Sequence, residues 1–278
     1  MDALNQQIKK FYDASTPVWL DTWGEHMHHG YYGDNLDKDH QQAQLDLVEE
    51  LLRWGGVEQA DQILDAGCGV DGSARLLAQK LGARRVLGCT LSSVQAERAA
   101  RYNKQAGLQD RVTIVARDMM TLGKADGPFD LIWSLESAEH IADKAGLLSM
   151  FYELLEPGGR LLLATWCHRE TPPALAFADH RVLEKLQRLY HLPPFVPLSQ
   201  LRQYASQAGF QAVKTEDWSE AVAPFWKAVI QSAMRLQSIK GLMQAGWPTI
   251  KGAWAMRQMT KGYKRGLIKF GVLQAMKV

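Results

Sequence analysis

Short apolar runs and helical patterns alternate through the middle of this chain. The runs typical of buried strands cover residues 62–66, 85–89, 112–116, 129–134 and 160–166. The helical patterns between them cover residues 73–81, 93–106 and 144–155. Because such alternation is typical of parallel strands joined by helical crossovers, five successive units predict an α/β fold.

The two ends of the chain add further elements. Before the first strand, apolar residues share one face of a predicted helix over 41–54. After the fifth strand, the pattern predicts a helix over 198–208, a strand over 210–217, helices over 224–240 and 249–265, and a closing strand over 267–276. Residues 168–197 interrupt the alternation with five prolines, and we interpret them as an insertion over the site.

The complete pattern predicts a Rossmann-like sheet of seven mostly parallel strands, with helices on both faces and a helical, aromatic cap. A length of 278 residues with 46% hydrophobic residues is enough for one large core. We interpret the chain as a single domain, 1–278, with four parts: a helical lid over 1–56, a cofactor-binding core over 57–167, the cap insertion over 168–197, and strands with basic helices over 198–278.

Charge is distributed unevenly along the chain. Residues 221–278 hold ten Lys and Arg and no Asp or Glu, whereas residues 1–220 carry a net charge of −8. The basic segment also contains Trp226, Trp247 and Trp254, a composition closer to a membrane-interface surface than to a DNA groove. The sequence therefore predicts an anionic membrane surface as a partner and no nucleic acid, with a solvated basic face as the alternative.

The cysteines and the lengths of the apolar stretches give information about the cellular compartment of the protein. Cys68, Cys89 and Cys167 form no CxxC pair, which is typical of a reducing compartment. No stretch reaches the roughly 18 consecutive apolar residues of a membrane-spanning helix, and residues 1–7 lack signal-peptide character. Together with the basic segment, these features predict a cytoplasmic protein that contacts a membrane peripherally.

A glycine-rich loop follows the first predicted strand. Gly67, Gly69 and Gly72 match GxGxxG, a pattern that lets the backbone approach a ligand closely. Asp71 inside the loop would repel a pyrophosphate, and no acidic residue ends the second strand to bind a ribose as in dinucleotide sites. Asp65 instead suits S-adenosylmethionine, which carries an ammonium and a sulfonium cation.

Other strand ends extend the predicted cofactor site. Asp118 and Met119 follow the third strand and suit the amino group and ring face of adenine. Thr90, Leu91 and Gln95 follow the second strand and could bind the ribose hydroxyls, and Ser92 between them could cap the next helix instead. No metal is predicted, because the neighbouring histidines in 26–29 have no carboxylate at coordinating spacing.

Beyond the glycine loop, several motifs occur in one order along nearly the whole chain. They are HMHHGYY at 26–32, WSLESAEH at 133–140, TWCHR at 165–169, DWSE at 217–220 and APFW at 223–226. With these motifs the chain resembles the gamma-tocopherol methyltransferase family of class I S-adenosylmethionine-dependent methyltransferases. It departs from the family at Asp71 and Ala138, where family members usually have glycine.

The resemblance implies methyl transfer to a ring carbon of a lipophilic phenol. It adds Ser134 and His29 to the cofactor site, and it implies acceptor contacts by Tyr12, Trp23, His28, Tyr31, Trp166, His168, Trp218 and Phe225. We predict that His140 accepts the phenol proton and that Glu139 orients the lid or the substrate, because a base suits this chemistry; the reverse assignment of the two residues is the alternative. The alternatives are N-methylation of an amine or indole nitrogen, and an inactive lipid-binding relative with Asp71 as the lesion.

Overall fold

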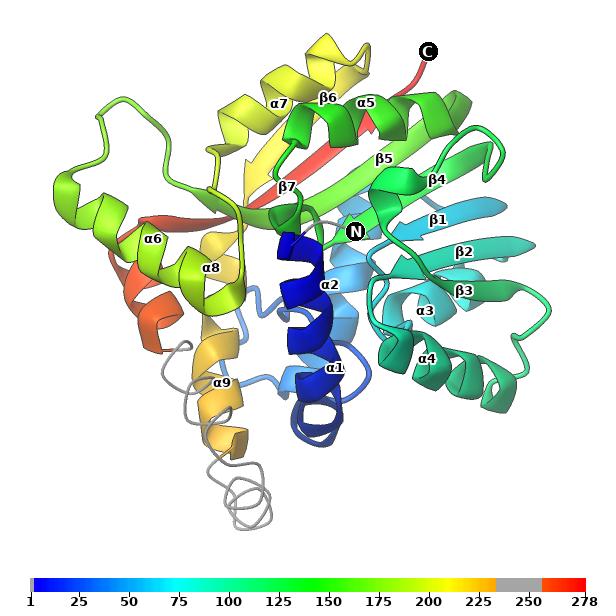
Figure 1. The fold of residues 1–278 in the computed structure, drawn as a ribbon, viewed down its shortest axis with the longest axis horizontal. Helices are drawn as coiled ribbons and strands as arrows, with labels where there is room; N and C mark the ends of the chain where they lie inside the picture. Colours follow the sequence, from blue (N-terminus) through cyan, green and yellow to red (C-terminus); the bar gives the residue numbers. More distant parts are fainter. Residues whose placement is uncertain (1–2, 234–256) are drawn as a thin grey trace.

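The computed structural model describes residues 3–233 and 257–278. They form a seven-stranded sheet in the order β3-β2-β1-β4-β5-β7-β6 (Figure 1). The strands are β1 (Gln62–Ala66), β2 (Arg85–Thr90), β3 (Val112–Ala116), β4 (Phe129–Leu135), β5 (Leu155–His168), β6 (Gln211–Asp217) and β7 (Ile268–Met276). Only β7 runs antiparallel to its neighbours β5 and β6, so the predicted Rossmann-like, mostly parallel sheet is confirmed.

Helices cover the sheet on both faces. They are α1 (Ala3–Trp23), α2 (His40–Gly55), α3 (Gly72–Lys80), α4 (Ser93–Gln105), α5 (Lys144–Leu154), α6 (Phe177–Tyr190), α7 (Leu198–Gln207), α8 (Ser219–Val222) and α9 (Pro224–Ala233). Residues 257–264 are also helical. The predicted helices over 224–240 and 249–265 match these ranges in part, and the remainder of each lies outside the described residues.

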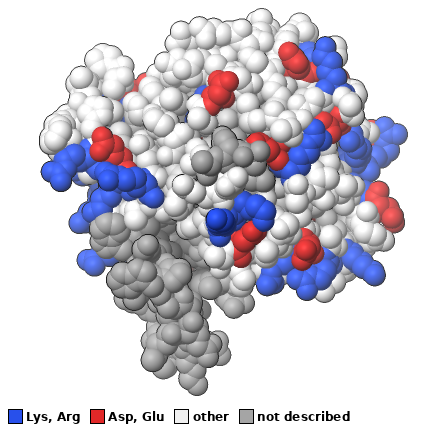
Figure 2. Space-filling view, in the orientation of Figure 1, with Lys and Arg blue, Asp and Glu red and all other residues white. Residues whose placement is uncertain are grey.

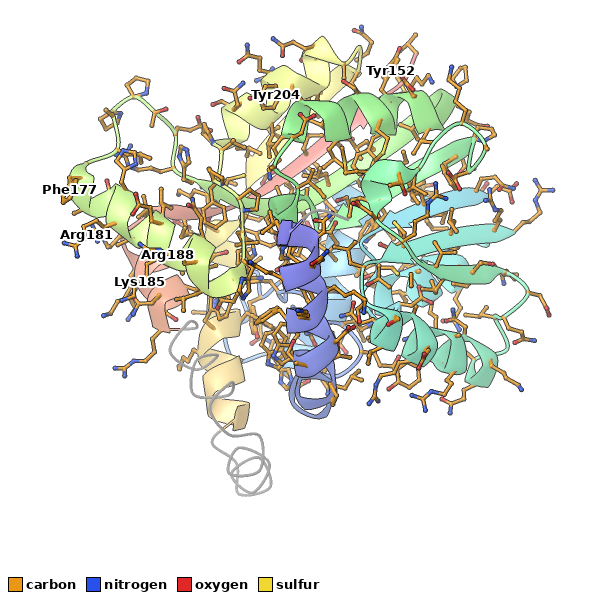
Figure 3. All side chains as sticks on the ribbon, in the orientation of Figure 1. Tyr152, Phe177, Arg181, Lys185, Arg188 and Tyr204 are labelled. Carbon is orange, nitrogen blue, oxygen red and sulfur yellow. The ribbon has the colours of Figure 1, made fainter. Side chains whose placement is uncertain are left out.

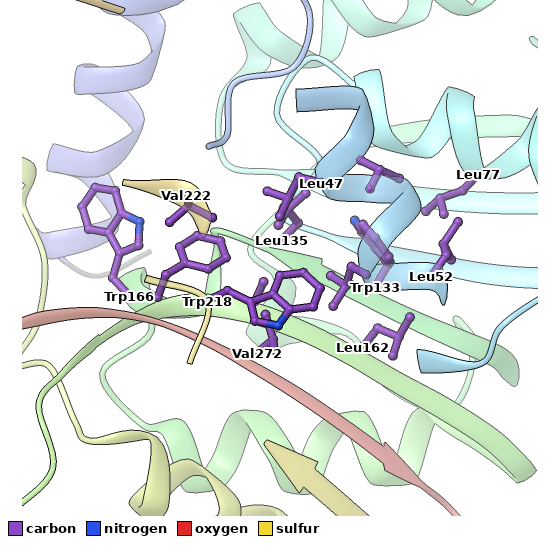
Figure 4. Packing of buried hydrophobic residues seen from close by; sticks show 14 of the residues in the cluster. Leu47, Leu52, Leu77, Trp133, Leu135, Leu162, Trp166, Trp218, Val222 and Val272 are labelled. Carbon is purple, nitrogen blue, oxygen red and sulfur yellow. The ribbon is translucent and has the colours of Figure 1, made fainter. Parts of the chain in front are cut away.

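Neighbouring residues of a strand contribute to different cores, as the two-residue period of a strand requires. In β1, Ile63 packs with α2 and α3, whereas Leu64 packs with α5 and α7 on the opposite face. On the first face, Trp133 of β4 and Leu162 of β5 are fully buried near Leu77 of α3 (Figure 4). Burial on both faces explains why the strands appear in the sequence as continuous apolar runs.

Two elements differ from the sequence prediction. The segment 168–197 contains α6, a helix that the prolines on either side of it concealed. Glu139 and His140 lie in a single 3-10 turn, Ala138–His140, which precedes α5 and which the apolar pattern did not show.

The basic segment is partly neutralised by the rest of the chain. Lys269 lies 2.8 Å from Asp217, and Arg265 lies 3.0 Å from Asp179 of α6. Figure 2 shows Lys and Arg side chains over α6 on the left and around α4 and the β3 edge of the sheet on the right. Acidic side chains lie among them. No helix in the parts of the chain that the structure describes is long and apolar enough to cross a membrane.

Candidate active site

A cleft of about 930 Å³ opens at the carboxyl ends of the parallel strands. The sheet order reverses direction between β1 and β4, and such a switch point is where open α/β sheets bind their ligands. The loops after β1, β2, β3 and β4 line the cleft, and residues from α1 and from 25–28 cover it. Clefts at this position of an α/β sheet commonly bind small-molecule ligands.

The glycine loop forms one wall of the cleft. The amides of Gly67 and Cys68 donate hydrogen bonds to the carbonyl of Cys89, at 3.0 and 2.9 Å, and this turns the chain sharply after β1. Gly67 has a φ of +91°, and a Cβ atom there would lie 2.3 Å from the Cβ of Ser137. Only glycine fits this position without displacing its neighbour.

Asp65 lies at the base of the same loop. Its side chain is buried, and its Oδ2 has no hydrogen-bond partner among the described residues. Burial raises the pKa of Asp65 well above its ordinary value, and nearby Asp71 adds to the effect. A cationic ligand group would stabilise the ionised carboxylate, so Asp65 fits a positively charged ligand.

The cleft brings together eight of the ten residues predicted for the cofactor. They are Asp65, Gly67, Gly69, Thr90, Leu91, Gln95, Asp118 and Met119. Ser134 does not line the cleft, because its hydroxyl faces inward and lies 2.9 Å from that of Ser137. His29 lines a second cavity instead. Ser92 caps α4 by accepting a hydrogen bond from the amide of Gln95 at 3.1 Å.

The second cavity, of about 530 Å³, adjoins the first and is lined mainly by aromatic rings. Trp19 and Trp23 stack with ring centres 5.2 Å apart on one side of it. The two cavities share five lining residues: Tyr12, Met27, His28, Glu136 and His140. A ligand in the aromatic cavity would therefore meet a ligand in the cleft at these residues.

Most of the predicted acceptor contacts lie in the second cavity, namely Tyr12, Trp23, His28, Trp166 and Phe225. Three do not line it. Tyr31 packs edge-on against Trp218, which is buried between Tyr31 and Trp54 in the core. His168, at the end of β5, turns toward the carbonyl of Arg169.

Glu136 connects the elements around both cavities. Its carboxylate accepts hydrogen bonds from the backbone amide of His29 at 2.6 Å, from Nδ1 of His29 at 2.8 Å and from the Trp166 indole at 3.1 Å. Burial opposes ionisation, but the contacts from His29 hold the pKa of Glu136 below its ordinary value. Glu136 also has a φ of +50°, a strained conformation for a residue with a side chain and one that often marks functional sites.

Glu139 and His140 both line the aromatic cavity. Burial and nearby Glu136 raise the pKa of Glu139 to about 8, so its carboxyl group is mostly protonated at neutral pH. The Oε2 atom of Glu139 lies 2.7 Å from the hydroxyl of Thr165. Burial, with Lys144 nearby, lowers the pKa of His140 to about 4. The imidazole of His140 is therefore neutral, and its Nε2 lies 2.9 Å from the Tyr12 hydroxyl.

Tyr190 and Leu192, at the end of α6, also line the aromatic cavity and were not predicted. Figure 3 shows Phe177, Arg181 and Lys185 pointing outward from the opposite side of this helix. The helical spacing of Leu183, Leu186 and Tyr190 was a signal that could have revealed α6. Among the described residues, no three His, Cys, Asp or Glu side chains are grouped as a metal site would require.

Comparison with known proteins identifies the family. A family model described as "Methyltransferase domain" matches residues 36–215. The chain is 40% identical to a protein of Oryza sativa subsp. japonica named probable tocopherol O-methyltransferase, chloroplastic, over 99% of this chain and 78% of that protein. It is 37% identical to tocopherol O-methyltransferase, chloroplastic, of Arabidopsis thaliana, over 99% of this chain and 83% of that protein. The chain belongs to the tocopherol methyltransferase family. Its cofactor is S-adenosylmethionine.

A solved structure supports the fold. The mycolic acid cyclopropane synthase CmaA1, solved in complex with S-adenosylhomocysteine, superposes with a TM-score of 0.84 at 19% identity. The superposition covers 100% of this chain and 99% of that one. The Rossmann-like fold is therefore shared at only 19% sequence identity.

The predicted location is wrong. The sequence indicated a cytoplasmic protein at a membrane periphery, whereas both tocopherol methyltransferases are chloroplastic by name. Redox environment and apolar stretches do not distinguish these compartments, which explains the error. The comparisons also give no support for a membrane surface as partner, and residues 234–256 of the basic segment lie outside the described residues.

Helix α1 covers the cofactor cleft through polar side chains. Asn5 donates a hydrogen bond to Asp118 at 2.6 Å, Asp13 accepts one from Ser92, and Lys9 donates one to Ser93 at 3.2 Å. Figure 1 shows α1 lying in front of the sheet beside α4. These contacts join α1 to the two loops predicted to hold the ribose and adenine.

Removing two of these contacts is expected to speed the release of cofactor. In the double variant Asn5→Ala, Asp13→Ala, each lost hydrogen bond weakens the closed position of α1 by about 1 kcal/mol, so S-adenosylmethionine should dissociate about tenfold faster or more. Stopped-flow displacement measures this rate. Exposed Lys10→Ala on the same helix is the control. An unchanged dissociation rate in the double variant would show that α1 does not retain the cofactor.

Proposed function

We propose that this chain transfers the methyl group of S-adenosylmethionine to a ring carbon of a lipophilic phenol of the tocopherol type. The main support for this function is the aromatic cavity, which adjoins the cofactor cleft and shares five lining residues with it. Stacked and edge-on rings provide a large apolar surface for an aromatic acceptor. The names of the two plant relatives support a tocopherol-type acceptor.

The residues of the cleft fit the cofactor. Asp65, with its unpartnered buried oxygen, and the backbone of Gly67 and Gly69 would hold the methionine end. Thr90, Leu91 and Gln95 would hold the ribose, and Asp118 with Met119 the adenine. When bound, S-adenosylmethionine supplies an electrophilic methyl group on a sulfonium.

The residues of the aromatic cavity must both orient the acceptor ring and remove its phenol proton. The aromatic walls exclude water and hold the ring against the cleft, since orientation of two reactants can supply much of the rate enhancement. A polar group must also take the phenol proton, because a free phenol with a pKa near 10 is hardly ionised at neutral pH. Glu139 is suited to donate a hydrogen bond rather than to accept a proton. His140, the base predicted from sequence, has a neutral imidazole and lines both cavities.

An inactive relative with Asp71 as its lesion has less support. Asp71 replaces the family glycine at a φ of +75° without opening the loop, and Asp tolerates this conformation better than most residues. Asp71 does not line the cleft, so its charge does not face the ligand.

An activity panel tests the proposal. The protein is incubated with S-adenosylmethionine labelled in the methyl group and with γ-tocopherol, a prenylated hydroquinone or an indole amine. Label transferred to the phenols and not to the amine is expected. Transfer to the amine alone would establish N-methylation instead, and no transfer to any acceptor, together with retained cofactor binding, would support an inactive relative.

A further inference from the structure

A buried histidine–carboxylate pair lies at the edge of the aromatic cavity. Nδ1 of His29 lies 2.8 Å from Oε2 of Glu136, and both side chains are almost inaccessible to solvent, at 1% and 8% exposed. The backbone amide of His29 donates to the other carboxylate oxygen at 2.6 Å. The hydrogen bond at Nδ1 orients the ring of His29, and the amide hydrogen bond holds its backbone against the same carboxylate.

This pairing determines which ring nitrogen of His29 is free. Because an ionised carboxylate can only accept hydrogen bonds, Nδ1 carries the hydrogen that it donates to Glu136. In the neutral ring, Nε2 then bears a lone pair. Nε2 is buried and has no hydrogen-bond partner among the described residues, although His29 lines the aromatic cavity.

Two aromatic rings that pack against His29 carry unpartnered donors. The ring of Trp226 lies edge-on to His29 with centres 4.9 Å apart, and its buried Nε1 has no partner within the described part of the chain. The hydroxyl of Tyr263 is likewise buried without a partner, with ring centres 6.1 Å from His29. Buried polar groups normally have partners, and both His29 and Trp226 line the aromatic cavity, so an acceptor nitrogen and an N–H donor in this lining are complementary to a hydroxyl group.

We propose that His29 is the catalytic base of the reaction, with its Nε2 accepting the proton of the phenol hydroxyl and Glu136 as the positioning residue. The inference rests on the proposed function, since it requires a phenol in the aromatic cavity. Trp226 donates to the phenol oxygen as negative charge develops on it. A carboxylate behind the imidazole stabilises the imidazolium that forms, as in other histidine–carboxylate pairs.

The position of His29 also accounts for methylation at carbon. His29 and Trp226 line the aromatic cavity and not the cofactor cleft. A phenol oxygen held there is turned away from the methyl donor, and a carbon of the ring faces the cleft. A base at His140, which lines both cavities, would instead hold the oxygen next to the donor and favour methylation of the oxygen.

The proton and electron balance of the step is complete without a further reactant. His29 takes the hydroxyl proton while the ring carbon forms its bond to the methyl group, and the electron pair of the broken carbon–sulfur bond stays on sulfur. The hydrogen on the methylated ring carbon then leaves as a proton to solvent. His29 returns its proton to the oxygen, which restores the phenol.

The charged and titratable groups around His29 favour this role. Glu136 follows β4 and is anionic, and the adjacent His28 is kept neutral because burial lowers its pKa. Tyr263, from the helical residues 257–264, keeps its proton because burial and nearby carboxylates raise its pKa. The rings of Trp166, Phe225, Trp226 and Phe270, which carry no charge, also pack against His29.

The test uses His29→Gln, Glu136→Gln and His140→Gln, with exposed His180→Gln as control. With γ-tocopherol and S-adenosylmethionine, His29→Gln should lower kcat at pH 7 by about 100- to 10,000-fold, and its kcat should rise with pH as the phenol ionises unaided. Glu136→Gln should lower kcat with little change in KM and shift the pH profile. Calorimetric binding of S-adenosylmethionine verifies that each variant is folded.

A second measurement does not depend on turnover. With S-adenosylhomocysteine in the cleft, ultraviolet difference spectra recorded over a range of pH report the pH at which bound γ-tocopherol ionises. This ionisation should occur at a lower pH in the wild type and in His140→Gln than in His29→Gln, because only His29 and Trp226 contact the phenol oxygen. The proposal is overturned if His29→Gln keeps both the wild-type kcat and the wild-type ionisation pH while His140→Gln loses them. Absence of turnover in the wild type would instead contradict the proposed function itself.

Discussion

Gly67→Val is expected to reduce S-adenosylmethionine binding by more than 100-fold. A Cβ atom at this position would lie 2.3 Å from the Cβ of Ser137, and the side chain of Ser137 is itself hydrogen-bonded to the carbonyl of Ala66. Ser137 therefore cannot move aside freely, and the loop must shift into the cleft. A β-branched residue at a φ of +91° adds backbone strain of about 1–3 kcal/mol. Titration calorimetry measures the affinity.

Gly82→Val is the control that separates the effect of backbone strain from the effect of the steric clash with Ser137. Gly82 has a φ of +72°, but a Cβ there would have no neighbour within 4 Å, and the residue does not line the cleft. It should lose stability to a comparable degree and keep its affinity for S-adenosylmethionine. If Gly67→Val binds as tightly as Gly82→Val, the loop is not part of the cofactor site.

Asp71→Asn is expected to stabilise the protein in a pH-dependent way. Burial raises the pKa of Asp71 to about 7, although Arg75, 3.7 Å away, and Asn103 partly offset this. The carboxyl group therefore favours folding only while protonated, and it destabilises the native state as the pH rises from about 4 through 7. The advantage of Asp71→Asn should be about 2–3 kcal/mol larger at pH 8 than at pH 5.

Urea unfolding of wild type and variant at the two pH values measures this difference. Asparagine keeps the shape of the side chain and tolerates a positive φ, so the comparison isolates the charge. Exposed Asp110→Asn is the matched control and should change stability little at either pH. An equal effect of Asp71→Asn at pH 5 and pH 8 would mean that the buried carboxyl group does not titrate in this range.

The alternation of short apolar runs with helical patterns along the chain was sufficient to predict the sheet. Strands buried on both faces, such as β1 and β2, have no polar alternation to confuse with loops, and their helices show clear spacing. α6 was missed because Pro172, Pro173 and Pro193 near its ends suggested a loop throughout. The short 3-10 turn at Ala138–His140 has too few residues to produce any period at all.

The cofactor cleft was more predictable than the acceptor cavity. Its residues follow the ends of successive strands, so the topology brings Asp65, Thr90 and Asp118 together. The acceptor cavity combines side chains from α1, α6 and α9, and no local pattern shows which face of a helix meets another element. Trp218 and Tyr31 illustrate this, because these aromatic residues pack into the core instead.

The position of the transferred methyl group distinguishes methylation at a ring carbon from methylation at the phenol oxygen. The most direct measurement is the position of the methyl group in the product formed from γ-tocopherol and S-adenosylmethionine carrying a 13C-labelled methyl group, determined by carbon nuclear magnetic resonance. We expect the label on an aromatic ring carbon, with the hydroxyl group still free. Label on the phenol oxygen would rule out methylation at carbon, because it would place that oxygen beside the cofactor cleft rather than at His29.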